Sequence, residues 1–86
     1  MPKITIYTTK YCSFCDAAKG LLERKGIPFE EIDVTDDEAK FALKKKTGWR
    51  TVPQIFIGEE MIGGYQELEE LERSGELEKR LLPSPL

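Results

Sequence analysis

The sequence contains no histidine, and only two of its 86 residues are cysteines. A structural zinc site built from Cys and His needs four ligands, so the chain cannot assemble one alone. Long apolar runs are also missing, since no stretch approaches the roughly 18 residues of a membrane-spanning helix. Acidic side chains outnumber basic ones by 16 to 13, which gives a formal net charge of −3. We therefore expect neither a membrane nor nucleic acid as a partner, because binding to phosphates needs a basic surface.

The first residues do not resemble a secretory signal. Residues 1–7 alternate polar and apolar side chains, whereas a signal peptide needs a continuous apolar stretch. We expect a cytoplasmic protein in a reducing compartment, where a pair of cysteines favours redox chemistry over a structural disulfide. A chain of this length fits one domain, so residues 1–86 are expected to form a single one.

Charge is unevenly distributed along the chain. Half of the acidic residues lie beyond residue 58, while basic residues cluster in the middle. Most of these side chains are expected on solvated helix faces, but a few of the mid-chain cations are expected to face a small anion. The cations of this cluster are Lys40, Lys44, Lys45, Lys46 and Arg50.

Hydrophobic periodicity predicts alternating strands and helices. Alternation with period two predicts strands over 4–7, 29–34, 52–57 and 61–62. Helical spacing, with glycine stops, predicts helices over 13–25 and 36–46 and from 65 onward, the last interrupted at 74–75. We expect Ala39, Ala42 and Leu43 to point inward from the second helix, and Leu77, Leu81 and Leu82 to continue the apolar stripe of the third.

This β-α-β-α-β-β-α order has one economical arrangement. The first two strands pair in parallel through a right-handed helical crossover, and the last two form an antiparallel hairpin. The prediction is an α/β fold in which helices cover both faces of a four-stranded mixed sheet. It places Cys12 at the carboxyl end of the first strand, where open α/β sheets hold their reactive sites.

Cys12 and Cys15 form a C-x-x-C motif at the start of the first predicted helix. Unpaired N–H groups and the helix dipole favour a thiolate at Cys12, and Lys10 adds a nearby cation. Cys15 lies one turn deeper on the same side, where it can attack a mixed disulfide on Cys12. We therefore interpret Cys12 as the nucleophile and Cys15 as the resolving thiol, more buried and with a raised pKa. The alternative is that both are small core residues.

Three separated motifs resemble those of the dithiol glutaredoxins. They are Tyr11-Cys12-Ser13-Phe14-Cys15, the T-V-P-Q-I-F-I segment over 51–57, and Ile62-Gly63-Gly64, with the resemblance covering about 4–82. The resemblance implies a thioredoxin fold and a monomeric, glutathione-dependent thiol–disulfide oxidoreductase. Its substrates would be protein disulfides and mixed disulfides of proteins with glutathione.

The resemblance also implies a glutathione site built from matching positions. Pro53 would be cis and face the nucleophile, which leaves the backbone of Val52 free to pair with the tripeptide. Backbone amides at the helix start would hold the γ-glutamyl carboxylate. The matched positions are Phe14, Thr51, Val52, Pro53, Gly64, Tyr65 and Gln66.

Two departures concern the charges that hold glutathione. Gln66 stands where the family commonly has an aspartate, so Glu67 would have to supply a carboxylate for the glutathione amine. The lysine that usually stands three residues before the nucleophile is shifted, because Lys10 is only two before Cys12. Arg50 or Lys45 is the alternative cation for the glycyl carboxylate.

A third departure leaves other functions open. Ser13 replaces the proline that commonly follows the first cysteine, and it supplies a backbone N–H that proline lacks. Glutaredoxins with a small residue at this place include some that hold a two-iron cluster between two protomers. A further alternative is a redoxin reduced by thioredoxin reductase, although the T-V-P-Q and I-G-G segments favour glutathione.

Overall fold

The structure is a computed structural model that describes residues 2–81. Its elements follow the predicted order, and the last helix is divided in two at the predicted interruption. The strands are β1 (Ile4–Thr8), β2 (Glu30–Asp33), β3 (Gln54–Ile57) and β4 (Glu60–Gly63), and the helices are α1 (Ser13–Arg24), α2 (Asp37–Thr47), α3 (Tyr65–Ser74) and α4 (Glu76–Leu81).

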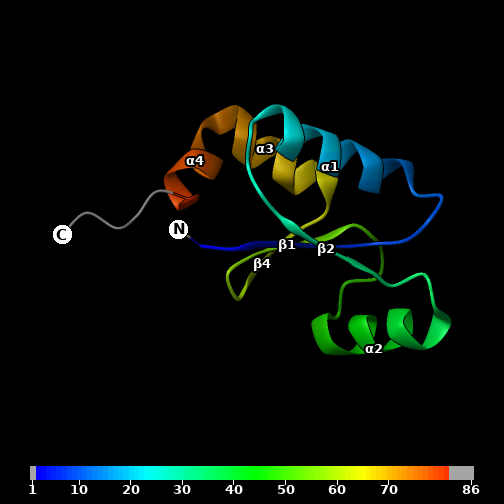
Figure 1. Cartoon of the computed structure of the whole chain (residues 1–86). Coiled ribbons are helices and arrows are strands. Elements are labelled where there is room, and N and C mark those ends of the chain that lie inside the picture. The colour runs from blue at the N-terminus through cyan, green and yellow to red at the C-terminus, as the bar shows by residue number, and fades with distance from the viewer. Residues whose placement is uncertain (1, 82–86) are drawn as a thin grey trace.

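The four strands form one mixed sheet in the order β2-β1-β3-β4 (Figure 1). β1 pairs with β2 in parallel, with Tyr7 opposite Ile32. β1 and β3 are antiparallel, as are β3 and β4. This confirms the predicted parallel crossover and the predicted hairpin, and the arrangement is the thioredoxin fold.

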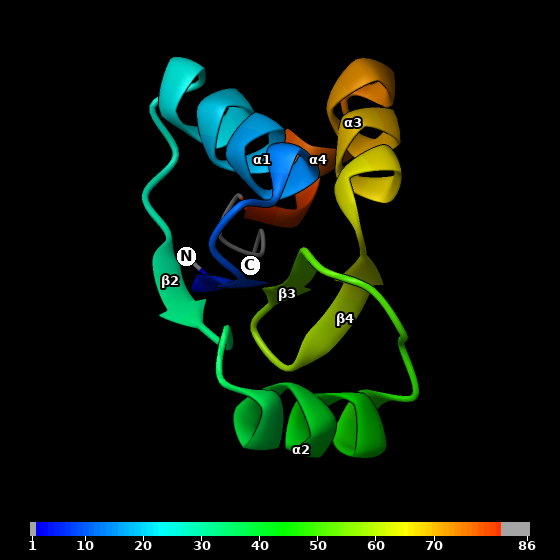
Figure 2. The same cartoon turned by 90° about the vertical axis from the view of Figure 1, so that its right-hand side faces the viewer.

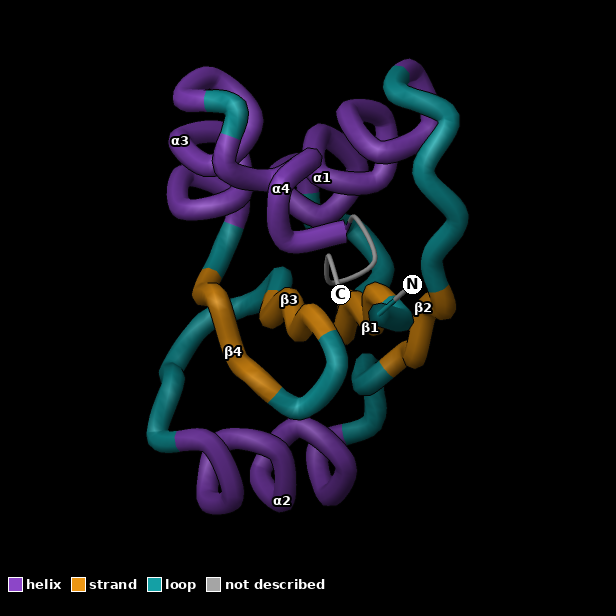
Figure 3. The backbone as a smooth tube through the Cα atoms, turned by 90° about the vertical axis from the view of Figure 1, so that its left-hand side faces the viewer, coloured by secondary structure: helices purple, strands orange, loops and turns teal. Residues whose placement is uncertain are grey.

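Helices cover both faces of the sheet, as expected. α1, α3 and α4 lie on one face, and α2 lies alone on the other (Figures 2 and 3). In Figure 1, α2 lies beneath the end of the sheet at which the chain leaves β1 for α1. No helix within residues 2–81 combines the length and the apolar composition needed to cross a membrane.

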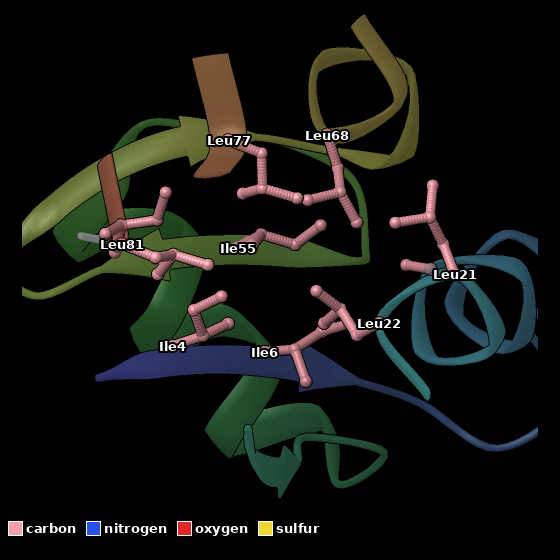
Figure 4. Close-up of a cluster of buried hydrophobic side chains, with 10 residues drawn as sticks. Ile4, Ile6, Leu21, Leu22, Ile55, Leu68, Leu77 and Leu81 are labelled. Atoms are coloured by element: carbon pink, nitrogen blue, oxygen red, sulfur yellow. The ribbon is translucent and has the colours of Figure 1, made fainter. Parts of the chain in front are cut away.

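The hydrophobic core lies between the sheet and the three-helix face. Alternate residues of β1 point toward it, because successive side chains of a strand face opposite sides. Figure 4 shows isoleucines of β1 and β3 meeting leucines from α1, α3 and α4. The buried cluster comprises Ile4, Ile6, Ala18, Leu21, Leu22, Ile55, Ile57, Leu68, Leu77 and Leu81.

The second helix buries less than the sequence predicts. Leu43 is buried and Ala39 is half-buried, but Ala42 is exposed, so its predicted inward orientation is wrong. Spacing by four aligns Ala39, Leu43 and Thr47 along the sheet-facing stripe, and Ala42 is rotated away from that line.

The last predicted helix breaks where the sequence indicates. Gly75 adopts a left-handed conformation, with φ of 82°, which ends α3. This backbone region suits glycine because a side chain meets steric resistance there. Leu77 and Leu81 of α4 are buried, as predicted, and Leu82 lies outside the described residues.

Candidate active site

Cys12 is the N-cap residue of α1. Its backbone is extended, with φ of −120° and ψ of 105°, and its Sγ accepts a hydrogen bond from the backbone N–H of Cys15 at 3.1 Å. The Cys12 carbonyl accepts from the N–H of Asp16, also at 3.1 Å. The sulfur thus occupies the position of the serine or aspartate oxygen that commonly satisfies free N–H groups at a helix start. Cys12 is half-buried, so its sulfur is close to solvent.

The chain reaches Cys12 through a turn with an unusual backbone. Tyr11 has φ of 60° and a fully exposed side chain. Positive φ is uncommon for a residue with a side chain, and such conformations concentrate at functional sites. The backbone N–H of Lys10 donates to Thr35 Oγ1 at 2.9 Å, which ties this turn to the segment after β2.

Cys15 lies deeper than Cys12, as the sequence predicts. It is only 1% exposed. Burial raises the pKa of the Cys15 thiol to about 12, and the hydrogen bond with Cys12 acts in the same direction. A backbone hydrogen bond from Thr9 and the charge of Lys19 lower this pKa. Cys15 therefore keeps its proton at neutral pH in the reduced protein.

A small charged network lies near the same part of α1. Lys19 follows Cys15 by four residues, so the two side chains share one face of the helix. Lys19 Nζ contacts Glu31 Oε2 at 3.0 Å, and the same oxygen accepts from Thr8 Oγ1 at 2.6 Å. These hydrogen bonds lower the pKa of Glu31, with the bond from Thr8 contributing most. The contact with Glu31 is the largest cause that raises the pKa of Lys19.

The loop before β3 faces the sulfur of Cys12. The Val52–Pro53 peptide bond is cis, as the resemblance implies. Cys12 Sγ donates to the Val52 carbonyl oxygen at 3.8 Å. The loop therefore presents the backbone of Val52 beside the cysteine at the helix start.

The double glycine after β4 closes the other side of this loop. A Cβ on Gly64 would lie 3.4 Å from the Pro53 carbonyl oxygen, an ordinary contact distance, so the two segments pack against each other. Gly63 has φ of 120°, and a Cβ there would come within 2.8 Å of Glu67 Cγ. Glu67 Oε1 accepts from the Gly64 N–H at 2.8 Å, which caps the start of α3.

Two clefts share Trp49, Thr51 and Val52 among their lining residues. One, of about 360 Å³, is lined by Phe14, Trp49, Thr51, Val52, Pro53, Gly64, Tyr65, Gln66 and Glu67. The other, of about 300 Å³, is lined by Thr9, Lys40, Leu43, Lys44, Trp49, Arg50, Thr51, Val52 and Gln54. A larger hollow of about 790 Å³ lies between β4, α3 and α4, and Val52 does not line it. We regard the two smaller clefts as the candidate site, because Val52 lines both and its carbonyl lies 3.8 Å from Cys12 Sγ.

Most residues predicted for the site come together in these clefts, but two of the candidate cations do not. Lys10 is exposed and lines neither cleft. Lys45 also lines neither, and its Nζ lies 5.8 Å from the centre of the Phe41 ring. Arg50 does line the second cleft, together with Lys40 and Lys44. Lys40 and Lys44 are four residues apart, so their spacing predicts that they share one face of α2. It does not predict that this face points toward the second cleft.

A buried amide holds the segment between the clefts in place. Gln54 is 2% exposed, and its Nε2 donates to the Trp49 carbonyl at 2.8 Å. Its Oε1 lies 2.9 Å from Thr47 Oγ1, which accepts from the Trp49 N–H at 3.1 Å. Gln54 thereby joins the end of α2 to β3. The sequence pattern placed Gln54 only in a strand, so this network was missed.

Comparisons with known proteins agree with this geometry. The family model described as Glutaredoxin matches residues 4–62, a segment that contains both cysteines and the cis proline. A glutaredoxin of Pseudomonas aeruginosa is 48% identical over 82 residues, or 94% of this chain and 98% of the relative. The solution structure of glutaredoxin from Brucella melitensis is 40% identical, with a TM-score of 0.84, and the match covers 100% of this chain and 95% of that one. The crystal structure of a buckwheat glutaredoxin–glutathione complex is 31% identical, with a TM-score of 0.83, and covers 93% and 76% of the two chains.

Proposed function

Because this chain belongs to the glutaredoxin family, we propose that it is a glutathione-dependent reductase of protein disulfides and of mixed disulfides with glutathione. The observation that carries this proposal is the position of Cys12 Sγ, at a helix start and 3.8 Å from the Val52 carbonyl. Free N–H groups at this end of a helix favour a thiolate, which is the form that attacks a disulfide. We propose that one domain carries the activity as a monomer in the cytoplasm, where glutathione is available.

Reduction of a glutathione mixed disulfide needs only Cys12. Its thiolate attacks the glutathione sulfur, a new S–S bond forms, and the protein thiolate leaves and takes a proton from water. The thiolate of a second glutathione then attacks the glutathione sulfur held on Cys12. Glutathione disulfide leaves, and the Cys12 thiolate is restored.

Reduction of a protein disulfide uses both cysteines. Cys12 attacks one sulfur of the disulfide and forms a mixed disulfide with the protein, while the other sulfur leaves as a thiolate. Cys15 loses its proton and attacks Cys12, which releases the reduced protein and leaves a Cys12–Cys15 disulfide. Two glutathione molecules then reduce this disulfide and are themselves oxidised to glutathione disulfide. The raised pKa of Cys15 makes removal of its proton the demanding part of this route.

The two clefts suggest how glutathione binds. The backbone of Val52 is available to pair with the peptide part of the tripeptide. The start of α3 offers the backbone N–H groups of Tyr65 and Gln66 to the γ-glutamyl carboxylate, whereas the Gly64 N–H already donates to Glu67 Oε1. Phe14 lies at the entrance, with its ring 6.1 Å from that of Tyr65. The related buckwheat glutaredoxin was crystallised as a complex with glutathione, which supports the same ligand for this chain.

The second cleft is the proposed place of the glycyl carboxylate. Arg50 lines it beside Thr51, whereas Lys10 and Lys45 lie elsewhere. We therefore assign the carboxylate to Arg50, with Lys40 and Lys44 adding positive charge at the same cleft. For the glutathione amine, Gln66 offers only an amide oxygen. Glu67 lines the first cleft, and its Oε1 already accepts from the Gly64 N–H. We therefore propose that its second carboxylate oxygen binds the glutathione amine.

A coupled assay tests the proposal. The protein is supplied with a glutathione mixed disulfide, glutathione and glutathione reductase, and consumption of NADPH is followed. We expect turnover that depends on glutathione. If the protein turns over only when thioredoxin reductase replaces the glutathione system, it is a redoxin of the other type. Visible absorbance of anaerobically purified protein would instead favour the cluster-binding alternative.

A further inference from the structure

A large aromatic side chain lies exposed on α2, away from the cysteines in sequence. Three large apolar side chains are strongly exposed within residues 2–81: Tyr11, Phe14 and Phe41. The first two flank Cys12, but Phe41 is on α2 and is 64% exposed. Lys45 Nζ lies 5.8 Å from the centre of its ring, within the range of a cation–π contact. The Phe41 ring therefore lies outside the hydrophobic core, beside a charged neighbour.

Lysine side chains are concentrated around Phe41. Four lysines occur among residues 40–46, and none of them makes an ion pair within residues 2–81. By contrast, several basic residues on other elements pair with a glutamate or an aspartate, namely Lys3, Lys19, Lys25, Arg73 and Arg80. The N-cap and first turn of α2 carry Asp36, Asp37 and Glu38, so the positive charge gathers toward the last turn of the helix, at Lys44, Lys45 and Lys46.

This charged surface is continuous with the active site. Lys40 and Lys44 line the cleft that also contains Val52, and the Val52 carbonyl is 3.8 Å from Cys12 Sγ. Phe41 and Lys45 each follow one of these lysines, so they form the adjacent stripe of the same helix. α2 covers its face of the sheet alone (Figure 2), and Leu43 is its only buried residue within residues 37–47. The outer stripes of the helix are therefore open to a partner.

We propose that the α2 outer surface (Lys40, Phe41, Lys44 and Lys45) docks acidic segments of protein substrates beside the reactive cysteine. This inference rests on the proposed function, because it concerns which proteins that site reduces. Carboxylates of the substrate pair with the lysines, and an apolar side chain next to them covers Phe41. A peptide of mixed acidic and apolar character fits better than a polyanion, because Asp37 and Glu38 in the first turn of α2 repel continuous negative charge.

The probes for this proposal are glutathionylated model peptides that are identical except for their charge. Glutamate, glutamine or lysine flanks a phenylalanine and the modified cysteine, and kcat/KM is measured for each peptide at low and high salt. We expect the glutamate peptide to be reduced roughly tenfold faster than the lysine peptide at low salt. This preference should shrink at high salt, because exposed ion pairs are screened.

Two variants separate the α2 outer surface from net charge. Lys45→Glu should lower kcat/KM for the glutamate peptide by roughly threefold and raise it for the lysine peptide. Lys79→Glu makes the same change of charge on α4, where Lys79 is exposed and has no ion pair within residues 2–81, and it should change neither value. Phe41→Ser should lower kcat/KM for all three peptides.

The outcomes distinguish the two proposals. If the wild-type protein reduces all peptides equally, or if Lys79→Glu acts like Lys45→Glu, the docking surface is refuted. A small glutathione mixed disulfide with 2-mercaptoethanol serves as the reference substrate, and its reduction should be unchanged in Lys45→Glu, Phe41→Ser and Lys79→Glu. If the wild-type protein fails to reduce even this compound, the proposed function itself is wrong.

Discussion

The backbone N–H of Cys15 donates a hydrogen bond to Cys12 Sγ across 3.1 Å. One contact therefore links the two cysteines before any disulfide forms. It completes the N-terminal cap of α1 and directs a partial positive charge at the sulfur that we propose as the nucleophile. It also fixes Cys15 one turn deeper in the helix, where burial keeps its thiol protonated.

The capping role of Cys12 predicts a difference between two inactive variants. Cys12→Ser retains an acceptor for the Cys15 N–H, whereas Cys12→Ala removes it. We expect Cys12→Ala to be less stable than Cys12→Ser by about 1 kcal/mol, the typical contribution of an N-cap side chain. Denaturation by urea measures both free energies of unfolding. Equal stability of the two variants would show that the sulfur does not cap the helix.

The raised pKa of Cys15 predicts that the reduced protein loses stability in alkaline solution. Below about pH 9, both the folded and unfolded chains keep this proton, so the pKa difference has no effect. Between about pH 9 and 12 the unfolded chain has lost the proton and the folded chain holds it. The free energy of unfolding therefore falls as pH rises, by at most about 1.4 kcal/mol per pH unit.

Cys15→Ser is the control for this pH dependence. Serine does not titrate in this range, so the slope of stability against pH above pH 9 should be shallower in the variant. Other titrating groups, including the paired lysines, contribute equally to both proteins. Identical slopes would show that Cys15 titrates alike in the folded and unfolded chains.

Lys19 is predicted to assist the resolving step alone. Its charge lowers the pKa of Cys15, so Lys19→Met should leave Cys15 harder to deprotonate. We expect reduction of a peptide disulfide to slow roughly two- to tenfold, with its pH profile shifted to higher pH. Lys19→Arg keeps the charge and should remain close to wild type. The control is a Cys15→Ser background, in which Lys19→Met should not alter the rate at which a glutathione mixed disulfide is reduced. If that rate falls as much as the rate with the peptide disulfide, the role of Lys19 is merely structural.

Gln54 is predicted to support both stability and glutathione binding. Gln54→Leu removes the donor to the Trp49 carbonyl, whereas the Thr47 hydroxyl keeps its bonds with the Leu43 carbonyl and the Trp49 N–H. Each buried polar group left unpaired costs about 1–3 kcal/mol. Because Trp49 and Val52 line both clefts, we also expect the KM for glutathione to rise. Thr47→Ser keeps the hydroxyl and should change the free energy of unfolding and the KM for glutathione little. An unchanged KM for glutathione in Gln54→Leu would refute the role of Gln54 in positioning the glutathione site.

The elements with strong local patterns could be predicted from the sequence. Alternation at Ile4 and Ile6 marked β1, and the glycine after residue 74 marked the end of α3. Helical spacing from Ser13 onward placed Cys12 at a helix start, where backbone N–H groups are free. The cis conformation of Pro53 followed from the family resemblance, because its residues alone indicate only the start of a strand.

Features set by packing between distant elements were not predictable in this way. The rotation of α2 about its axis depends on how Leu43 meets the sheet, and it turned Ala42 outward and brought Lys40 and Lys44 to the cleft. The hydrogen bonds of Gln54 join segments that hydrophobic periodicity treats separately. Such contacts depend on three-dimensional packing, which a reading of local spacing does not contain.

The activity of the two cysteine variants tests the central claim most directly. Cys12→Ser and Cys15→Ser are compared with wild type in the coupled assay, once with a glutathione mixed disulfide and once with a peptide disulfide. We predict that Cys12→Ser is inactive with both substrates, and that Cys15→Ser loses only the peptide disulfide. Activity retained by Cys12→Ser, or loss of both activities in Cys15→Ser, would contradict the assignment of Cys12 as the sulfur that carries glutathione.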